Sequence, residues 1–251
     1  MIAFTPDSAL VDLVTPSPNH GDRRGRRVDS LILHYTGMPT AEGALQRLCD
    51  AAAEVSSHYL VFEDGRIAQL VPEDRRAWHA GRSFWAGETD MNSASIGVEI
   101  VNPGHDAGAP PFPEAQIEAV IRLAADVMQR RGIAPERVLA HSDIAPGRKV
   151  DPGESFPWAR LASCGVGLWR EPAPLADGLV LARGATGDRV RALQDGLASL
   201  GYGIDATGEY DAATETVVGA FQRRWRPARI DGAADVSTAR TLDALLKLRR
   251  A

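Results

Sequence analysis

The hydrophobic residues of the first part of the chain fall into short β-rich runs that alternate with helical patterns. Five runs predict strands, at 28–35, 57–62, 66–71, 95–101 and 138–141. Two stretches predict helices, at 40–52 and 113–131, the second with Pro113 in its first turn and Gly132 after its end. Strands that alternate with covering helices predict an α/β fold, here with a mixed central β-sheet flanked by helices.

One loop between two predicted strands carries a specific turn signal. Asp64 and Gly65 stand between the runs 57–62 and 66–71. An Asp-Gly pair flanked by strands favours a two-residue hairpin turn in which both residues need a positive φ. We therefore predict a β-hairpin whose turn is formed by these two residues.

The hydrophobic pattern becomes purely helical after a stretch of glycines and prolines. Residues 166–178 show no clean period and are predicted to form a linker. Residues 179–251 contain three apolar stripes at helical spacing, which predict a small three-helix domain. The predicted division is therefore a larger domain over 1–165, the linker, and the three-helix domain.

Two further patterns characterise this helical part. The motif Gly-x-x-Asp-x-x-Thr at 208–214 returns at 232–238, and in each copy the aspartate is placed to cap the next helix. The run FQRRWR at 221–226 mixes aromatic and basic residues, as nucleic-acid-binding surfaces do. Because Phe221 and Trp225 are four residues apart, we predict that they pack in the core with the arginines outside.

Composition and charge narrow the classes of function. Of the 251 residues, 44% are hydrophobic and 24% are charged, as in ordinary globular proteins, which excludes a disordered chain. Two cysteines, Cys49 and Cys164, cannot form a disulfide scaffold. The net charge of −5 makes nucleic acid and anionic membrane poor candidates for partners.

Targeting signals are not recognisable in the sequence. It contains no run of about 20 apolar residues, so no membrane-spanning helix is expected. The opening stretch lacks the basic start and continuous apolar core of a signal peptide, and has no cysteine for a lipid anchor. The expected location is the cytoplasm, and the alternative is the periplasm if an export signal has been removed.

Two histidines and one aspartate are the strongest candidates for chemistry. His34 and His141 each follow an apolar run at the carboxyl end of a predicted strand, where α/β sheets place their ligands. Asp151 follows shortly after His141. Two histidines and a carboxylate would give zinc three ligands and one open position, as in catalytic sites. Hydrogen-bonded core histidines are the alternative, and Asp143 is a rival ligand.

Glu99 is the second unusual residue, because it interrupts the apolar run 95–101. An unpaired buried carboxylate costs several kcal/mol, so such a group is paired or belongs to a site. One interpretation is a core ion pair. The other is a general base beside a metal-activated water.

At this point the ordered motifs resemble the zinc amidases of the amidase-2 family, over roughly residues 10–165. The family comprises N-acetylmuramoyl-L-alanine amidases related to peptidoglycan recognition proteins, and the likeness is to its AmiD/AmpD branch. The motifs that carry it are His34-Tyr35-Thr36, Ser57-His58-Tyr59-Leu60-Val61, Ala77-Trp78-His79-Ala80-Gly81, Asn92 with Ser95-Ile96-Gly97-Val98-Glu99-Ile100, and the run from His141 to Gly153. The tail resembles a peptidoglycan-binding module, through 190–194, 200–202, 208–211 and 221–222.

The resemblance implies a metal centre. His34, His141 and Asp151 would bind one Zn²⁺ per chain, which leaves Asp143 outside the ligand set. A zinc ion at such a site provides both a nucleophilic water and a Lewis acid.

The resemblance also implies the reaction and its other residues. Glu99 would be the general base, Lys149 would stabilise the oxyanion, and His79 and Asn92 would line the substrate groove. The reaction would cut the amide between N-acetylmuramic acid, or its anhydro form, and the L-alanine of the stem peptide. Expected partners are muropeptides, anhydro-muropeptides or polymeric bacterial cell wall, in recycling or remodelling. A non-catalytic peptidoglycan receptor on the same fold is the alternative.

Overall fold

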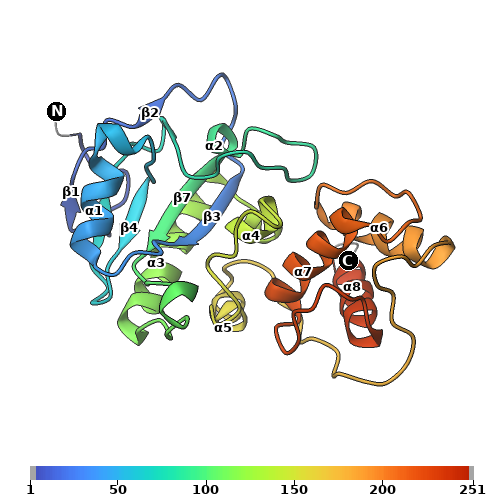
Figure 1. Cartoon of the computed structure of the whole chain (residues 1–251). Helices are drawn as coiled ribbons and strands as arrows, with labels where there is room; N and C mark the ends of the chain where they lie inside the picture. The colour runs from blue at the N-terminus through green and yellow to red at the C-terminus, as the bar shows by residue number, and fades with distance from the viewer. Residues whose placement is uncertain (1–3, 249–251) are drawn as a thin grey trace. The chain divides into compact units, whose positions relative to one another are not determined.

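The computed structural model describes residues 4–248, in which a mixed β-sheet with surrounding helices is followed along the chain by three more helices (Figure 1). The chain divides into two compact units. The first comprises Met1–Arg82, Asp90–His141 and Asp151–Leu168, and the second comprises Ser83–Thr89, Ser142–Val150 and Trp169–Ala251. The predicted α/β fold with a following helical part is confirmed.

The sheet of the first unit has six strands in the order β1-β5-β4-β7-β3-β8. Their bounds are β1 Leu13–Val14, β3 Ser30–Tyr35, β4 Tyr59–Val61, β5 Ile67–Gln69, β7 Ser95–Ile100 and β8 Val138–Ala140. Neighbouring strands are parallel except for the antiparallel pair of β4 and β5. A separate two-stranded antiparallel ribbon joins β2 (His20–Gly21) to β6 (Arg76–Ala77).

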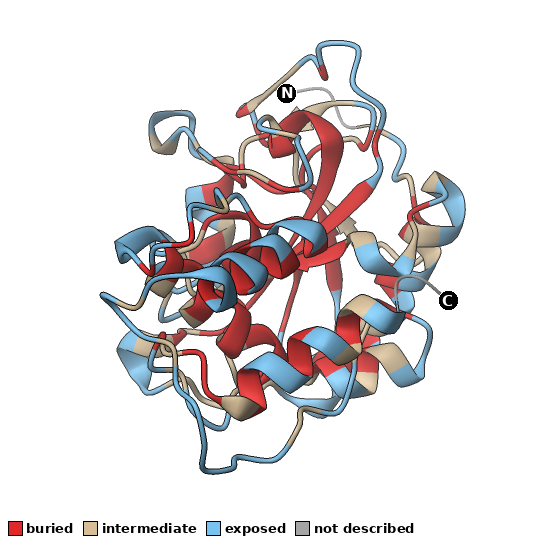
Figure 2. Ribbon diagram, turned by 90° about the vertical axis from the view of Figure 1, so that its right-hand side faces the viewer, coloured by how far each residue is buried: buried red, intermediate tan, exposed pale blue. Residues whose placement is uncertain are grey.

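The two predicted helices of the first unit, α1 and α3, lie close to their predicted ranges, and the unit also contains shorter helices that were not predicted. Their bounds are α1 Ala41–Cys49, α2 Met91–Ala94, α3 Glu114–Arg131 and α5 Trp158–Ser163, with short 3₁₀ helices at Ala51–Ala53, His105–Ala107 and Pro135–Arg137. The short helix α4 (His141–Ile144) begins at the end of the first unit and continues into the second. Leu48 of α1 packs with Leu60 of β4 and Ala68 of β5 in one hydrophobic cluster. Figure 2 shows the strands almost entirely in the buried colour, while the helices expose one side.

The hairpin forms, but its turn differs from the prediction. Gly65 has a φ of +88°, whereas Asp64 is not among the residues with positive φ. Phe62 N–H donates to Arg66 O and Gly65 N–H donates to Phe62 O. The loop therefore has three residues and places only its glycine in the left-handed region, as in a hairpin with a G1 bulge.

The second unit contains the three predicted helices, α6 (Asp188–Leu200), α7 (Ala212–Trp225) and α8 (Val236–Leu248). The predicted caps are confirmed, because Asp211 Oδ1 accepts from Thr214 N–H at 2.8 Å and Asp235 Oδ1 accepts from Thr238 N–H at 2.7 Å. The sequence repeat thus corresponds to two equivalent helix starts.

The prediction for the run at 221–226 is half right. Phe221 and Trp225 are buried as expected, but Arg224 and Arg226 are buried as well, at 2% and 1% exposure. The buried arginines have acceptors nearby: Arg226 donates to Thr238 Oγ1 at 2.7 Å, and Arg224 Nε lies 4.0 Å from an oxygen of Asp143. Helical spacing separates the faces of a helix, but it cannot show that a carboxylate from elsewhere in the chain lies near one of them.

Candidate metal centre and active site

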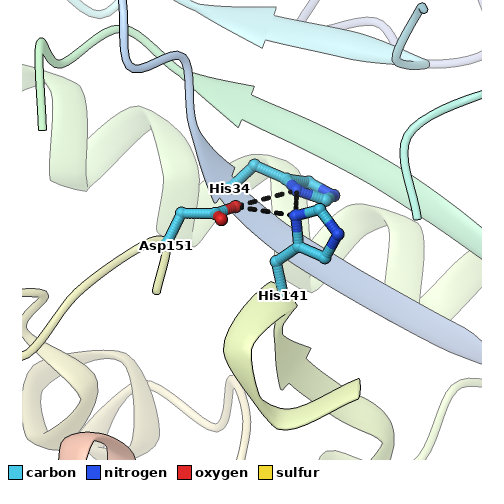
Figure 3. A group of neighbouring side chains, drawn as sticks. All are labelled: His34, His141 and Asp151. Atoms are coloured by element: carbon cyan, nitrogen blue, oxygen red, sulfur yellow. Dashed lines mark hydrogen bonds and ion pairs between the residues drawn. The ribbon is translucent and has the colours of Figure 1, made fainter. Parts of the chain in front are cut away.

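His34 meets His141 and Asp151, which lie much further along the sequence, at the carboxyl ends of β3 and β8 (Figure 3). His34 Nδ1 lies 2.9 Å from His141 Nδ1, and Asp151 Oδ2 lies 3.1 Å and 3.0 Å from these two nitrogens. All three residues are buried, and their ligand atoms lie within 4.8 Å of one another. Ligand atoms around a tetrahedral zinc ion, at about 2.0–2.1 Å from it, are roughly 3.3 Å apart, so this spacing is compatible with a metal ion.

The sheet register explains why the two histidines meet. Leu33 of β3 is the register partner of Ala140 of β8, and the strands are parallel. The residues that follow them, His34 and His141, therefore lie side by side at the ends of these neighbouring strands. Strand ends of this kind are the usual ligand sites of α/β sheets.

The surroundings of Asp151 keep its carboxylate ionised. Burial raises the pKa of this carboxyl group, but the charges and hydrogen bonds of His141 and His34 outweigh burial and lower the pKa below its usual range. Metal ligation requires a deprotonated carboxylate and neutral imidazoles. The Asp151 carboxylate is therefore in the protonation state that a divalent metal needs.

A chain of hydrogen bonds orients the His34 ring. The Ser95 hydroxyl donates a hydrogen bond to Met91 O. Its oxygen can therefore accept a hydrogen bond from His79 Nε2, which lies 3.4 Å away. His79 Nδ1 can then accept from His34 Nε2 at 3.0 Å, which leaves the lone pair of His34 Nδ1 directed at the ligand group. Burial, followed by the charge of His34, lowers the pKa of His79 well below its usual value and keeps the ring neutral. Such outer partners fix the tautomer of a metal-binding histidine.

The His141 ring is oriented by a backbone carbonyl. Its Nε2 lies 3.2 Å from Ala80 O and therefore carries the proton, so Nδ1 faces the ligand group with its lone pair. Asn92 fixes this part of the backbone, because its Oδ1 accepts from the N–H groups of both His79 and Ala80, at 2.9 Å and 2.7 Å. Asn92 thus holds the backbone of His79, which orients the His34 ring, and the backbone of Ala80, which orients the His141 ring.

We expect Asn92→Ala to weaken zinc retention about tenfold, because partners that orient metal ligands typically contribute 10–100-fold. Two buried N–H groups would lose their acceptor, and the backbone that contacts His34 and His141 would loosen. Competition with a chromophoric chelator measures the change. Asn102→Ala is the matched control, since Asn102 is also buried but bonds Gly104 and Pro110 instead. Equal zinc retention in both variants would contradict this role.

Gly97 supports the same arrangement, although its place in the sequence does not reveal this role. A Cβ atom at Gly97 would lie 2.5 Å from Cγ of His79, so only glycine leaves room for that ring. Its N–H donates to Nδ1 of the buried His58 at 2.9 Å. Burial, followed by the charge of Arg23, lowers the pKa of His58 to about 3, so this histidine is a neutral core residue. A glycine inside a strand signals that another group approaches the backbone closely, but it does not identify that group.

Glu99 lies on β7, directly beside the first histidine. Its register partners are His34 on β3 and Leu60 on β4, and all three strands are parallel to one another. Register partners on adjacent strands point to the same face of a sheet, so Glu99 and His34 share a face. Glu99 is half-buried, in contrast to its fully buried neighbours on the strand. The site face of the sheet thus carries a carboxylate next to the ligand group.

Lys149 and Asp143 belong to the second unit, within the segment 142–150. Lys149 is half-buried, and its N–H donates to Ala145 O at 3.0 Å. Asp143 is buried and accepts from the Tyr202 hydroxyl at 2.8 Å. It does not belong to the group formed by His34, His141 and Asp151.

The sequence matches two protein-family models. The first, described as N-acetylmuramoyl-L-alanine amidase, matches residues 24–154, which is just over half of the 251 residues. The chain belongs to the N-acetylmuramoyl-L-alanine amidase family. The resemblance inferred from the sequence motifs is thereby confirmed. In this family member a second model, described as a putative peptidoglycan binding domain, matches residues 186–242.

Known amidases resemble the chain over most of its length. AmiD of Escherichia coli K12, named an N-acetylmuramoyl-L-alanine amidase, is 40% identical over 235 residues, covering 88% of this chain and 83% of that protein. A structure of E. coli AmiD with anhydro-N-acetylmuramic acid-L-Ala-D-gamma-Glu-L-Lys aligns over 92% of both chains, with 37% identity and a TM-score of 0.74. AmpDh3 of Pseudomonas aeruginosa, in complex with anhydromuramic pentapeptide, aligns over 99% of both chains, with 32% identity and a TM-score of 0.73. The likeness therefore extends through the three-helix part of this amidase.

Proposed function

We propose that the chain hydrolyses the amide between N-acetylmuramic acid, or its anhydro form, and the L-alanine of the peptidoglycan stem peptide. The observation that carries the proposal is the group of His34, His141 and Asp151, with Glu99 on the adjacent strand, in a member of the amidase family. The ligands named with the two related structures, both anhydromuramyl peptides, belong to this class of substrate.

The metal in this proposal is one zinc ion per chain, with His34, His141 and Asp151 as its ligands. The set supports zinc because it combines two imidazoles with a carboxylate, at distances from one another that suit a small tetrahedral ion. At a three-ligand site of this kind zinc lowers the pKa of a bound water to about 7 and polarises a carbonyl.

The other proposed residues handle protons and charge. Glu99 takes a proton from the attacking water as the water oxygen bonds to the carbonyl carbon, and returns it to the leaving amine as the carbon–nitrogen bond breaks. Lys149 balances the negative charge that develops on the carbonyl oxygen. Preorganised donors of this kind are worth about 10²–10³ in rate. His79 and Asn92 are proposed to line the groove that receives the substrate, in addition to their contacts near the metal centre.

The domain division is also proposed in functional terms. Residues 1–165 would form the amidase domain and 179–251 the peptidoglycan-binding domain, with 166–178 as the linker. The proposal is supported by the two family matches, since 24–154 falls inside the first range and 186–242 inside the second.

A cytoplasmic location remains a proposal from the sequence. Within residues 4–248, the helices are too short or too polar to cross a bilayer. Fractionation of cells that express the full-length gene product, with marker enzymes for each compartment, is the test. Recovery with a periplasmic marker would replace the cytoplasmic assignment by the alternative.

The decisive experiment is release of free stem peptide from a soluble anhydro-muropeptide, with and without a chelator. We expect release by the purified chain, loss of release after chelation, and recovery when zinc is added back. Binding of the muropeptide without any release would instead support the receptor alternative. Release that survives full removal of the metal would contradict the proposed metal centre.

A further inference from the structure

The second unit is more than the three-helix domain. It also contains two segments from within the amidase part of the sequence, Ser83–Thr89 and Ser142–Val150. The second of these, called here the 142–150 segment, is joined by peptide bonds to His141 at one end and to Asp151 at the other. It therefore connects two of the three proposed metal ligands.

We propose that the three-helix domain positions the 142–150 segment for catalysis, with Tyr202 as the main positioning residue. This inference rests on the proposed function, and goes beyond it by giving the domain a role apart from binding the cell wall. Tyr202 lies just after α6 and is not proposed to touch substrate or metal. It acts through Asp143, two residues after His141.

The contact between Tyr202 and Asp143 is buried and charge-assisted. The Tyr202 hydroxyl donates to Asp143 Oδ1 at 2.8 Å, and both side chains are about 1% exposed. Arg224 of α7, also buried, lies 4.0 Å from the other carboxylate oxygen. Burial, followed by the charge of Asp143, raises the pKa of Tyr202, so the phenol stays protonated as a donor. A buried carboxylate is strongly destabilising without such partners, so this contact fixes Asp143 in place.

Two further contacts attach the 142–150 segment. A Cβ atom at Gly147 would lie 2.7 Å from Cγ2 of Thr216, so the backbone of the segment passes directly against α7. The carbonyl of Ile144 accepts from Phe84 N–H at 2.8 Å, which joins the segment to Ser83–Thr89.

The segment Ser83–Thr89 is itself anchored at the end of α6. Ala86 N–H donates to Gly201 O at 2.8 Å. The Trp85 ring meets the Tyr202 ring edge-on, with centroids 4.9 Å apart. Tyr202 thus contacts both inserted segments, Ser83–Thr89 with its ring and the 142–150 segment with its hydroxyl.

These contacts affect how well ordered the 142–150 segment is, rather than whether the protein folds. A segment that links two ligands over a few residues samples other paths unless contacts restrict it, and its ordering carries an entropic cost. Groups that fix ligands from outside typically change metal affinity or activity by 10–100-fold. The same segment carries Lys149, so its position would also affect stabilisation of the oxyanion.

The test compares two buried tyrosines of the same domain. Tyr202→Phe removes the hydroxyl bonded to Asp143. Tyr210→Phe, the matched control, removes a buried hydroxyl whose hydrogen bond goes to Gly232 O and not to the 142–150 segment. Both variants are assayed on soluble anhydro-muropeptide, so that attachment to the wall cannot influence the result. Zinc loss to a chelator and hydrogen exchange of peptides covering 142–150 are measured on the same samples.

For Tyr202→Phe we expect about a tenfold lower kcat with little change in KM, about tenfold faster zinc loss, and faster exchange across 142–150. Tyr210→Phe is expected to resemble the unmodified protein in all three, even if its Tm falls. Equal behaviour of the two variants would show that Tyr202 only stabilises the domain, and would overturn the proposal.

A replacement variant and two readouts that do not depend on activity keep the proposal testable. If Tyr202→Phe does not fold, Thr216→Ala replaces it, since this exposed residue contacts Gly147, and the same faster exchange is expected. If the unmodified protein releases no stem peptide, the proposed function fails. Zinc loss and hydrogen exchange then still decide whether the domain orders the segment.

Discussion

Glu99→Gln is expected to lower the rate of stem-peptide release by about 10³-fold while zinc remains bound at one ion per chain. Proton transfer by a positioned carboxylate typically contributes 10²–10⁴-fold, and an amide cannot accept the proton of the attacking water. Glu99 is suited to this role because it is half-buried and shares its sheet face with His34, its register partner. Turnover on soluble anhydro-muropeptide and zinc content by elemental analysis measure the two effects.

The control for this prediction is Glu136→Gln, the same chemical change at an exposed position of a 3₁₀ helix. It should leave both rate and zinc content unchanged. A Glu99→Gln protein with near-normal turnover would remove Glu99 from the mechanism. Loss of zinc in that variant would show instead that Glu99 acts through the metal site.

His141→Ala is expected to abolish both zinc binding and activity. The substitution deletes one of three ligands and leaves only His34 and Asp151, which lie 3.1 Å apart. Two ligands hold zinc far more weakly than three, and without the metal the attacking water loses the group that would lower its pKa. We expect zinc content to fall well below one ion per chain, and release to fall to the background rate.

His20→Ala provides a comparison for the loss of any histidine, because His20 lies on β2 and outside the metal group. It should retain zinc and activity. Full zinc occupancy in His141→Ala would contradict the proposed ligand set. A folded His141→Ala protein, verified by circular dichroism, separates loss of the metal from loss of the structure.

Local sequence patterns predicted the strands β3, β7 and β8 and the helix α3, because the pattern of buried positions is local information. The helix predicted at 113–131 is found at Glu114–Arg131, with Gly132 in the left-handed conformation at its end. The turn at Asp64 and Gly65 was wrong in detail, since only the glycine has positive φ. A dipeptide signal defines a turn region, while the pairing of the flanking strands selects the turn type.

The periodicity of hydrophobic residues does not show which distant strands pair with one another. The sequence placed His34 and His141 at the ends of strands, but not on neighbouring strands of the sheet. The register of β3 with β7 and β8 brings His34 beside both Glu99 and the start of α4. The hydrogen-bond chain through His79 and Ser95 has no sequence signal, because each link joins residues from different elements.

The sequence by itself determined the family, the α/β class, the three-helix part and the residues able to bind a metal, because these depend on residue type and on spacing along the chain. The tertiary structure alone decided what Asp143, Arg224 and Tyr202 do. The spacing of residues along the chain left Asp143 as a rival metal ligand and predicted that the arginines of 221–226 face solvent. The fold instead buries Asp143, Arg224 and Tyr202 together. A buried charge is stable only where distant segments supply its partners, and those partners are known only once the chain has folded.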